Sequence, residues 1–132
     1  MTFAPLPDHI ETLIHDVIGA AIEVHKVLGP GHLEQHYENA LCIELELRSI
    51  PFKRQQTVVL NYKGHEIGEG RIDLVVADEL VVELKAVEGI SNIHLAQVIS
   101  YLRIRESRAG LLLNFNVPAM NSKEAIRRVI VN

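Results

Sequence analysis

Residues 71–87, "RIDLVVADELVVELKAV", decide the fold, because they read as two apolar strands around a short acidic turn. Charged residues interrupt both apolar runs: Asp73 lies in the first, and Glu83 and Lys85 lie in the second. Side chains alternate along a strand, so Glu83 and Lys85 are predicted to point to the same side. The other side is predicted to be the packed one, formed by Leu80, Val82, Leu84 and Ala86.

The length of the turn determines where Asp73 lies relative to Glu83. If residues 77–79 form the loop, Val76 pairs with Leu80 and Asp73 lies opposite Glu83. Cross-strand partners have Cβ atoms about 5 Å apart. A loop one residue shorter would place the two carboxylates on opposite faces of the sheet. The symmetric register therefore predicts two carboxylates and an ammonium group on one patch of the sheet.

Two interpretations of this patch are open. Two carboxylates at this distance repel each other unless a cation or a proton lies between them. Hard oxygen ligands suit Mg²⁺ or Mn²⁺, so a metal site is one interpretation. The other is a solvated ladder of salt bridges on the exposed face of a hairpin, in which Lys85 pairs with the acids.

Two helices are predicted before the hairpin. The first covers residues 8–28, with Asp8 as its cap and Glu11 completing a capping box. Its apolar stripe is Ile10, Leu13, Ile14, Val17, Ile18, Ala21, Val24 and Leu28. Residues 29–31, "GPG", end it. The second covers residues 33–49, and its predicted inward side chains are Leu33, Tyr37, Ala40, Leu41 and Leu45.

The remainder of the chain predicts a sheet and one further helix. Strands are expected at residues 52–62, 65–78, 79–87 and 109–116, with the second and third joined near Asp78. In the first strand, Phe52, Val58, Leu60 and Tyr62 fall on one side by alternation. A helix is expected at residues 91–107, with a stripe of Ile93, Ala96, Gln97, Ser100, Tyr101 and Ile104. The tail, residues 121–132, favours a helix followed by a strand. This order predicts an α/β fold, with a mixed sheet flanked by helices.

Composition limits the class of protein. A chain of 132 residues, 48% hydrophobic and 23% charged, predicts one globular domain over residues 1–132. Cys42 is the single cysteine, so no internal disulfide can form. The net charge of −4 does not favour a nucleic-acid binder, although it says little about a local site. No signal peptide and no membrane-spanning run are recognised, so a cytoplasmic protein without membrane association is expected.

Several motifs, in order, resemble a known family. Asp73, then Glu83-Leu84-Lys85, then a helix, resembles the signature of the PD-(D/E)XK nuclease superfamily, with Ile72-Asp73 where the name has Pro-Asp. The segment "GHLEQHY", residues 31–37, is similar to the GxxExxY motif that names a family within it. "VIGAAIEVHKVLGPG", "ENALCIELELRSIPFKRQ", "VVELKAV" and "AQVISYLR" are similar too. The resemblance covers roughly residues 10–115.

The resemblance implies roles for particular residues. Asp73 and Glu83 would be metal ligands, with the Leu84 carbonyl as a third and Glu34 completing the acidic cluster. Lys85 would orient or activate the attacking water, or stabilise the developing charge on the phosphate. Gln97 would belong to the catalytic set. Tyr101, four residues later, would be auxiliary, as would Tyr37.

The implied fold and function are specific. The fold would be the αβββαβ core of restriction-endonuclease-like proteins, with an extra N-terminal helix. The activity would be hydrolysis of phosphodiester bonds with Mg²⁺ or Mn²⁺ as cofactor, since a carboxylate-bound metal lowers the pKa of its water. The expected partner is nucleic acid, DNA being favoured over RNA, and a homodimer is a further expectation. The alternative is a non-catalytic module that keeps the fold and binds nucleic acid or a protein.

Two weaker patterns compete for a function. His32 and His36 are four residues apart with Glu34 between them, which could be a zinc pair or an exposed polar face. Arg103, Arg105, Arg108, Lys53 and Arg54 could contact phosphates or form ordinary solvated surface.

Overall fold

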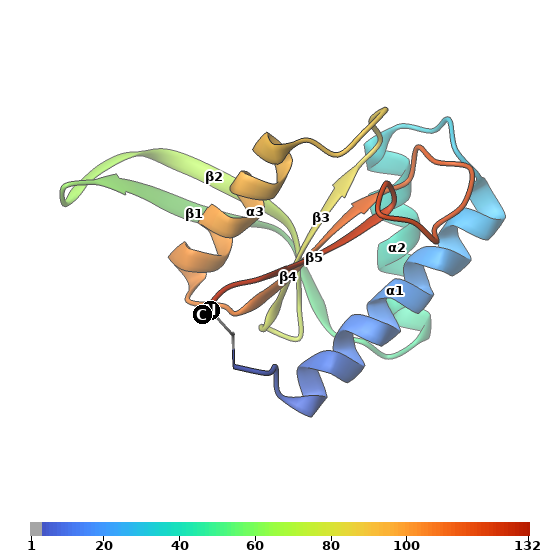
Figure 1. The fold of residues 1–132 in the computed structure, drawn as a ribbon, viewed down its shortest axis with the longest axis horizontal. Helices are drawn as coiled ribbons and strands as arrows, with labels where there is room; N and C mark the ends of the chain where they lie inside the picture. Colours follow the sequence, from blue (N-terminus) through green and yellow to red (C-terminus); the bar gives the residue numbers. More distant parts are fainter. Residues whose placement is uncertain (1–3) are drawn as a thin grey trace.

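The computed structural model describes residues 4–132. Two helices, α1 (Asp8–Leu28) and α2 (Glu34–Leu47), precede the hairpin strands β1 (Phe52–Tyr62) and β2 (His65–Val76). Strand β3 (Leu80–Lys85) and helix α3 (Asn92–Arg105) follow, and β4 (Ala109–Asn114) and β5 (Ile126–Ile130) end the chain. The α/β fold predicted from the sequence is confirmed, and its arrangement is that of a restriction-endonuclease-like core (Figure 1).

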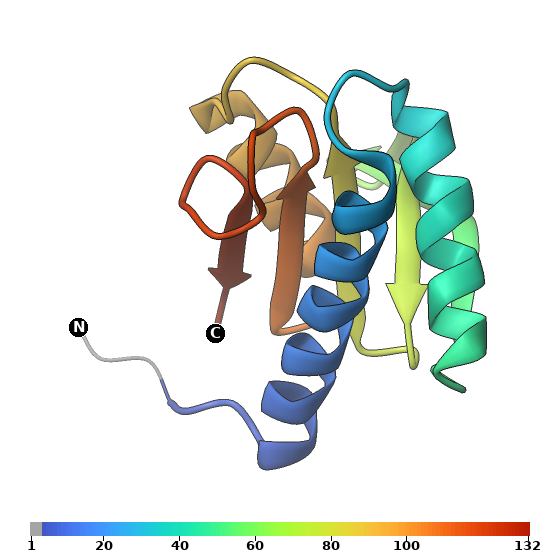
Figure 2. The same cartoon turned by 90° about the vertical axis from the view of Figure 1, so that its right-hand side faces the viewer.

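The five strands form one mixed sheet in the order β1-β2-β3-β4-β5. Strands β3 and β4 are parallel, with α3 as their crossover helix, and the other neighbours are antiparallel. Helices α1 and α2 cover one face and α3 covers the other, which Figure 2 shows from the side. The central strands β3 and β4 are therefore buried on both faces, which explains their nearly continuous apolar sequences.

The predicted hairpin register is present. Val76 pairs with Leu80, and Leu74 pairs with Val82, so the loop is residues 77–79. Ala77 and Asp78 both have positive φ, +52° and +58°, as a tight turn of this kind requires. The prediction that only one face of β3 is packed is wrong, because Val81 is buried against α3 on the other face.

A bend divides the β1–β2 hairpin into two parts. Ile72 packs on the α3 side, whereas Leu74 packs on the side of α1 and α2, although residues two apart normally share a face. The change occurs at Asp73. The opposite residue in β1, Gln55, has φ +50° and is likewise missing from the paired register. The predicted single side for β1 is corrected accordingly: Phe52 and Val58 pack on opposite faces.

The bend produces a fork in the sheet. The β2–β3 pairing begins at the turn and ends at Leu74 and Val82. Beyond that point β2 stays with β1 and leaves the body of the molecule as a hairpin, while β3 continues beside β4 (Figure 1). Asp73 lies on one branch of the fork and Glu83 on the other.

Three local predictions are corrected by the structure. Helix α1 begins at Asp8 with Pro7 as N-cap and no side-chain cap, and Glu11 binds Arg128 instead, at 2.8 Å. Leu33 precedes α2 and is 67% exposed rather than inward. The tail forms turns followed by β5, without the predicted helix, because residues 121–125 are held by main-chain bonds such as Ala125 N–H to Ser122 carbonyl, 3.1 Å.

The face of α3 that packs on the sheet is also not the predicted one. Of the predicted stripe only Tyr101 is buried, and Ile93 is 77% exposed. The buried residues are Val98, Tyr101 and Leu102, with Leu95 and Ile99 partly covered. The helix approaches closely because glycines lie beneath it. A Cβ on Gly110 would lie 2.9 Å from Val98 Cγ1, and one on Gly70 would lie 2.9 Å from Tyr101 Cε1.

This close approach gives a stability prediction. Gly110→Ala is expected to lower the free energy of unfolding by about 1–3 kcal/mol, because the added methyl group overlaps Val98 and also lies 3.2 Å from the Val81 carbonyl oxygen. Gly89→Ala is the matched control, since its Cβ would meet nothing nearer than Glu124 Oε2 at 3.9 Å. Urea unfolding of both variants makes the comparison. Equal stability of the two variants would refute the close packing of α3 on β4.

Candidate active site

The fork brings the two predicted strand carboxylates together. The main-chain N–H of Asp73 donates to Glu83 Oε1 at 3.1 Å, and the N–H of Leu84 donates to Asp73 Oδ2 at 2.8 Å. These side-chain bonds continue the contact of β2 and β3 after the main-chain pairing has ended. Each carboxylate is thereby fixed by one of its oxygens, and its second oxygen remains available to a further group.

Burial makes this carboxylate pair unusual. Glu83 is 4% exposed and Asp73 is half-buried. Loss of hydration raises the pKa of Glu83 well above its ordinary value, and the neighbouring Asp73 raises it further. The charge of Lys85 acts in the opposite direction but does not compensate. Without a bound cation, the pair therefore holds a proton at neutral pH.

The pH dependence of stability tests this state. The folded-state pKa of Glu83 lies above its unfolded value, so its stabilising contribution is complete below about pH 4.5 and is lost as pH rises through the folded-state value. In metal-free buffer, stability should fall between pH 5 and pH 8 with a slope of up to about 1.4 kcal/mol per pH unit from this group. Glu83→Gln, which mimics the protonated acid, should remove that part of the slope. A slope unchanged by Glu83→Gln would contradict the shared proton.

Lys85 lies beside the carboxylates without forming a close ion pair. It is half-buried at the end of β3. Its charge opposes the rise in pKa of both Glu83 and Glu34, so Lys85 lies within electrostatic reach of both. The ion pairs within 4.0 Å across residues 4–132 involve neither Lys85 nor Asp73, Glu83 or Glu34. The salt-bridge ladder that the sequence left open is therefore not formed.

Glu34 approaches the fork from the start of α2. Partial desolvation raises its pKa; Lys85 opposes the rise, and Asp73 adds to it. Among the described residues, no group of three or more His, Cys, Asp or Glu side chains is arranged as a ready metal cage. The structure thus places Glu34 within electrostatic reach of the strand carboxylates, at the edge of the cluster.

The local structure explains why Glu34 lies there. Gly31 has φ +96°, a conformation that favours glycine, and it turns the chain between α1 and α2. Tyr37, fully buried, donates its hydroxyl proton to the Gly29 carbonyl at 2.6 Å and accepts from the His32 N–H at 3.2 Å. Its ring stacks on Phe115 at 4.6 Å. Tyr37 therefore fixes the turn and the first turn of α2, and with it the position of Glu34.

The predicted pair on α3 is only partly associated with the site. Gln97 Nε2 donates to the Tyr101 hydroxyl at 3.2 Å, so the spacing of four brings the two together as expected. Tyr101 is buried against Gly70 of β2, whereas Gln97 is exposed. The hydrogen bond of Gln97 thus goes to Tyr101 rather than to Asp73, Glu83 or Lys85.

A buried network that the sequence reasoning missed supports the bend. Glu38 is 5% exposed and accepts from Arg54 Nη2 at 2.7 Å and Nε at 3.1 Å. Its other oxygen accepts from Gln55 Nε2 at 2.7 Å. Gln55 is the positive-φ residue opposite Asp73, so Glu38 holds the bend from α2. The only signal in the sequence is the spacing of four between Glu34 and Glu38.

Most of the predicted basic contacts serve other purposes in the structure. Arg54 is held by Glu38, and Lys53 lies 3.5 Å from Asp78. Arg108 donates to the carbonyls of Ala4 and Pro5, at 2.7 and 3.3 Å. The candidate zinc pair is also engaged by the backbone: His32 Nε2 lies 3.0 Å from the Leu28 carbonyl, and His36 Nδ1 accepts from the Leu33 N–H at 3.4 Å.

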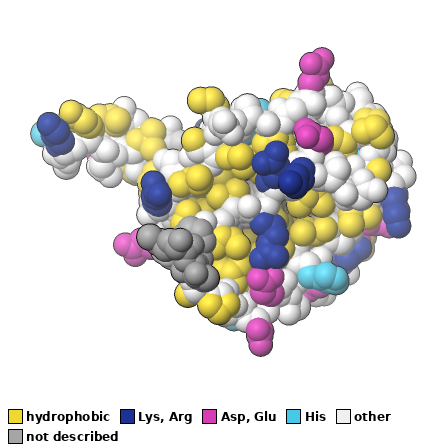
Figure 3. Space-filling model, viewed as in Figure 1, with side chains coloured by type: hydrophobic (Ala, Val, Ile, Leu, Met, Phe, Trp, Pro, Cys, Tyr) yellow, Lys and Arg dark blue, Asp and Glu magenta, His cyan; other side chains and the backbone are white. Residues whose placement is uncertain are grey.

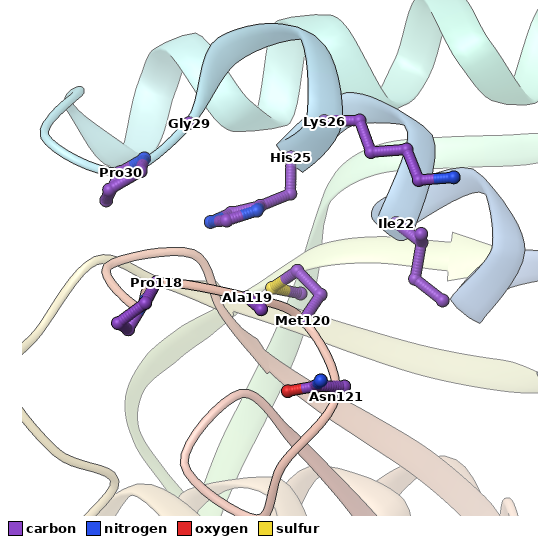
Figure 4. A pocket seen from close by; sticks show the side chains of 9 residues that line it. All are labelled: Ile22, His25, Lys26, Gly29, Pro30, Pro118, Ala119, Met120 and Asn121. Atoms are coloured by element: carbon purple, nitrogen blue, oxygen red, sulfur yellow. The ribbon is translucent and has the colours of Figure 1, made fainter.

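A separate cavity of about 490 Å³ opens between the end of α1 and the loop after β4. Figure 4 shows His25 and Lys26 on its helical wall and residues 118–121 on the loop wall. The buried His25 lies with Nε2 2.8 Å from the Val117 carbonyl, so it ties the loop to the helix. The fork residues do not line this cavity, and the chemistry of the site lies elsewhere.

The fold and the fork together define an α/β protein with an acidic, lysine-bearing site at the divergence of two central strands. Comparison with known families agrees: the description of the PD-(D/E)XK nuclease superfamily matches residues 11–129, so the chain belongs to that superfamily. No curated protein matches. A solved structure described as "Crystal structure of SSO0001" is similar at a TM-score of 0.47 and 16% identity, covering 89% of this chain and 77% of that one. No helix among the described residues is long and apolar enough to cross a membrane.

Proposed function

We propose that the protein is a metal-dependent nuclease that hydrolyses phosphodiester bonds in nucleic acid, with DNA favoured over RNA. The observation that carries this proposal is the contact of the buried Glu83 with the half-buried Asp73, beside Lys85, which forms no close ion pair with either. Burying two carboxylates together costs stability unless a cation or a proton neutralises them. A destabilising pair of this kind is more typical of a functional site than of a purely structural one.

The donor set fits a hard divalent cation. Asp73 and Glu83 each keep one oxygen that is not used by the hydrogen bonds to the Leu84 and Asp73 amides. Mg²⁺ is commonly held by one or two carboxylates and retains several waters. We propose Asp73, Glu83 and the Leu84 carbonyl as ligands, with Glu34 acting through a retained water. When bound, the metal would supply charge neutralisation and a water of lowered pKa.

The side chains of the chain itself would do the remaining work. Lys85 would bind a phosphate oxygen or orient the attacking water, because its charge acts on Glu83 and Glu34 while it forms no ion pair within 4.0 Å among the described residues. Glu38, through Gln55, would keep Asp73 on its branch of the fork. Gln97 would reach the substrate from its exposed position on α3, and Tyr101 would hold the Gln97 amide. Tyr37 is auxiliary in this proposal, because it positions Glu34.

We also propose that residues 1–132 act as one nuclease-like domain of the GxxExxY family. Support comes from the three motif positions, each of which has a separate task in the structure. Gly31 turns the chain with φ +96°, Glu34 faces the fork, and Tyr37 fastens the turn through the Gly29 carbonyl.

The alternative, a non-catalytic binding module, is favoured by the balance of charge. The net charge is −4, and Arg54, Lys53 and Arg108 are occupied within the protein. A nuclease assay separates the two. Purified protein is incubated with labelled single- and double-stranded DNA and RNA, in EDTA or in millimolar Mg²⁺ or Mn²⁺. Cleavage only with metal supports the nuclease, and binding without cleavage in every metal supports the module.

A further inference from the structure

The outer part of the β1–β2 hairpin stands free of the body, and we call residues 56–70 the arm. Figure 1 shows the arm projecting from the molecule with no helix beside its far end. Not one of residues 59–69 is buried. Val59, Tyr62 and Ile67 are large apolar side chains exposed by 37%, 59% and 65%. The base of the arm packs on α3, where Val58 is buried and Gly70 lies against Tyr101. Residues 59–69, beyond this base, have no packing partner within the described part of the chain, and a two-stranded hairpin alone is marginally stable in water.

The edge of the arm is unprotected. Within residues 4–132, strand β1 is the first strand of the sheet and pairs only with β2, so its other edge presents N–H and C=O groups that no strand pairs with. Residues 56–62, "QTVVLNY", contain no charge and no proline. Natural edge strands normally carry such groups, or bulges, to prevent pairing with another chain. The positive-φ residues Gln55 and Lys63 lie outside the segment, one at each end. The β1–β2 register shifts between Leu60 and Asn61, but the extra residue, Ile67, lies on β2 and not on the free edge.

The charge of the arm does not fit nucleic acid. Proteins bind the phosphate backbone chiefly through lysine and arginine. The arm bears Lys63 near its tip, together with His65, and the glutamates Glu66 and Glu69 follow on β2. Figure 3 shows mainly apolar and uncharged side chains along the visible face of the arm, with basic and histidine side chains at the tip. An extended strand of another protein fits this edge better.

We propose that the arm pairs with the arm of a second copy, β1 against β1 in antiparallel orientation, so that two sheets join into one. The uncharged segment predicts the register. Its centre is Val59, which would lie opposite Val59 of the other copy. Val58 would then pair with Leu60, Thr57 with Asn61, and Gln56 with Tyr62, and no like charges would meet across the seven positions. This proposal is independent of the proposed nuclease activity.

Cysteine cross-linking tests the centre of the register. In Val59→Cys the two new thiols would lie directly opposite each other, with Cβ atoms about 5 Å apart, close enough for a disulfide after mild oxidation. A covalent dimer on a non-reducing gel is expected. Ile67→Cys is the control, because Ile67 is more exposed than Val59 but lies on β2, away from the paired edge. The unmodified protein controls for Cys42, whose side chain is buried.

Two further variants test the neighbouring positions. Thr57→Cys alone and Asn61→Cys alone should cross-link poorly, since identical positions would be about 14 Å apart along the strands at ~3.4 Å per residue. The double variant should cross-link well, because Cys at 57 would face Cys at 61 of the other copy. Equal cross-linking in all single variants would indicate random collision and would overturn the register.

Solution mass tests the association itself. Light scattering of the full chain at concentrations up to about 100 µM is expected to show a dimer, and Val59→Lys should raise the dissociation constant at least about 10-fold by placing two like charges opposite each other. The melting temperature of the Val59→Lys monomer shows whether the fold is retained. The proposal is overturned if the unmodified protein is a monomer at the highest concentration. It is also overturned if Val59→Lys leaves the dimer unchanged. A monomer whose DNA binding is lost in Tyr62→Ala would overturn it as well, because the arm would then bind DNA and not a second copy.

Discussion

Lys85→Ala is expected to reduce metal-dependent cleavage by at least about 100-fold, because it removes the ammonium group that the fork offers to developing negative charge or to the attacking water. The loss should appear in kcat more than in KM, since Lys85 is proposed to act on the reacting group. The side chain is half-buried at the end of β3, so the fold should survive with a small change in melting temperature. Steady-state kinetics on the substrate found in the assay measures both.

The control for this variant is Lys123→Ala, an exposed lysine outside the fork. It should cleave at the rate of the unmodified protein. Stabilisation by Mn²⁺ should persist in Lys85→Ala, because the metal ligands remain and a competing positive charge is gone. A Lys85→Ala variant that cleaves normally would remove Lys85 from the mechanism. A variant that loses its Mn²⁺ response as well would indicate a structural role.

Asp73→Asn is expected to abolish stabilisation by metal. A ligand that binds only the folded state stabilises it by about 2.7 kcal/mol at 100 times its dissociation constant, which is a shift of several degrees in melting temperature. Asn at this position loses the charged ligand but can still accept the Leu84 N–H through its side-chain oxygen. Metal-free stability should hold or rise, because the negative charge of Asp73, which helps to raise the pKa of Glu83, is removed.

Melting curves with and without millimolar Mn²⁺ make this comparison even if no substrate is found. Asp16→Asn, a change on the surface of α1 where Asp16 lies 3.6 Å from His15, should keep the full Mn²⁺ response. Asp73→Asn could instead lower the metal-free melting temperature, while Mn²⁺ causes no shift in the unmodified protein. The carboxylates would then have only a structural role. The binding module would then be the better account.

The hairpin shows what the sequence can predict about such a site. The register follows from the loop of residues 77–79 and the apolar runs on either side, and the pairing of Val76 with Leu80 confirms it. Local turn geometry and alternation are sufficient for that prediction. The contact of Asp73 with Glu83 follows from the same symmetry, although it is made by side-chain bonds to main-chain amides rather than by the strand ladder.

The burial of Glu83 and the bend at Asp73 could not be predicted in the same way. Glu83 is buried because α3 covers the second face of β3, and alternation within one strand does not reveal what packs above it. The bend depends on Gln55, whose positive φ is held by Glu38 from a different helix. Both are tertiary effects that override local preference.

Helix α3 shows a further limit of periodicity. Its sequence contains two stripes of residues with helical spacing. The stripe predicted to pack on the sheet contains Ile93 and Ile104, and both of these side chains are exposed. The buried stripe, with Val98 and Leu102, packs over Gly110, where no side chain intervenes. Which stripe packs on the sheet depends on a small residue in β4, a strand that follows the helix. The sequence of the helix alone is therefore not sufficient to predict its buried face.

The most direct test of the metal site is a crystal structure of the unmodified protein grown or soaked with Mn²⁺. An anomalous difference peak is expected in the fork, about 2.1 Å from one oxygen each of Asp73 and Glu83, at the distance typical of a small hard cation. The Asp73→Asn crystal, treated identically, should lack the peak. A peak elsewhere, or an empty fork at millimolar Mn²⁺ with both carboxylates still hydrogen-bonded as described, would contradict a metal-dependent active site at Asp73 and Glu83.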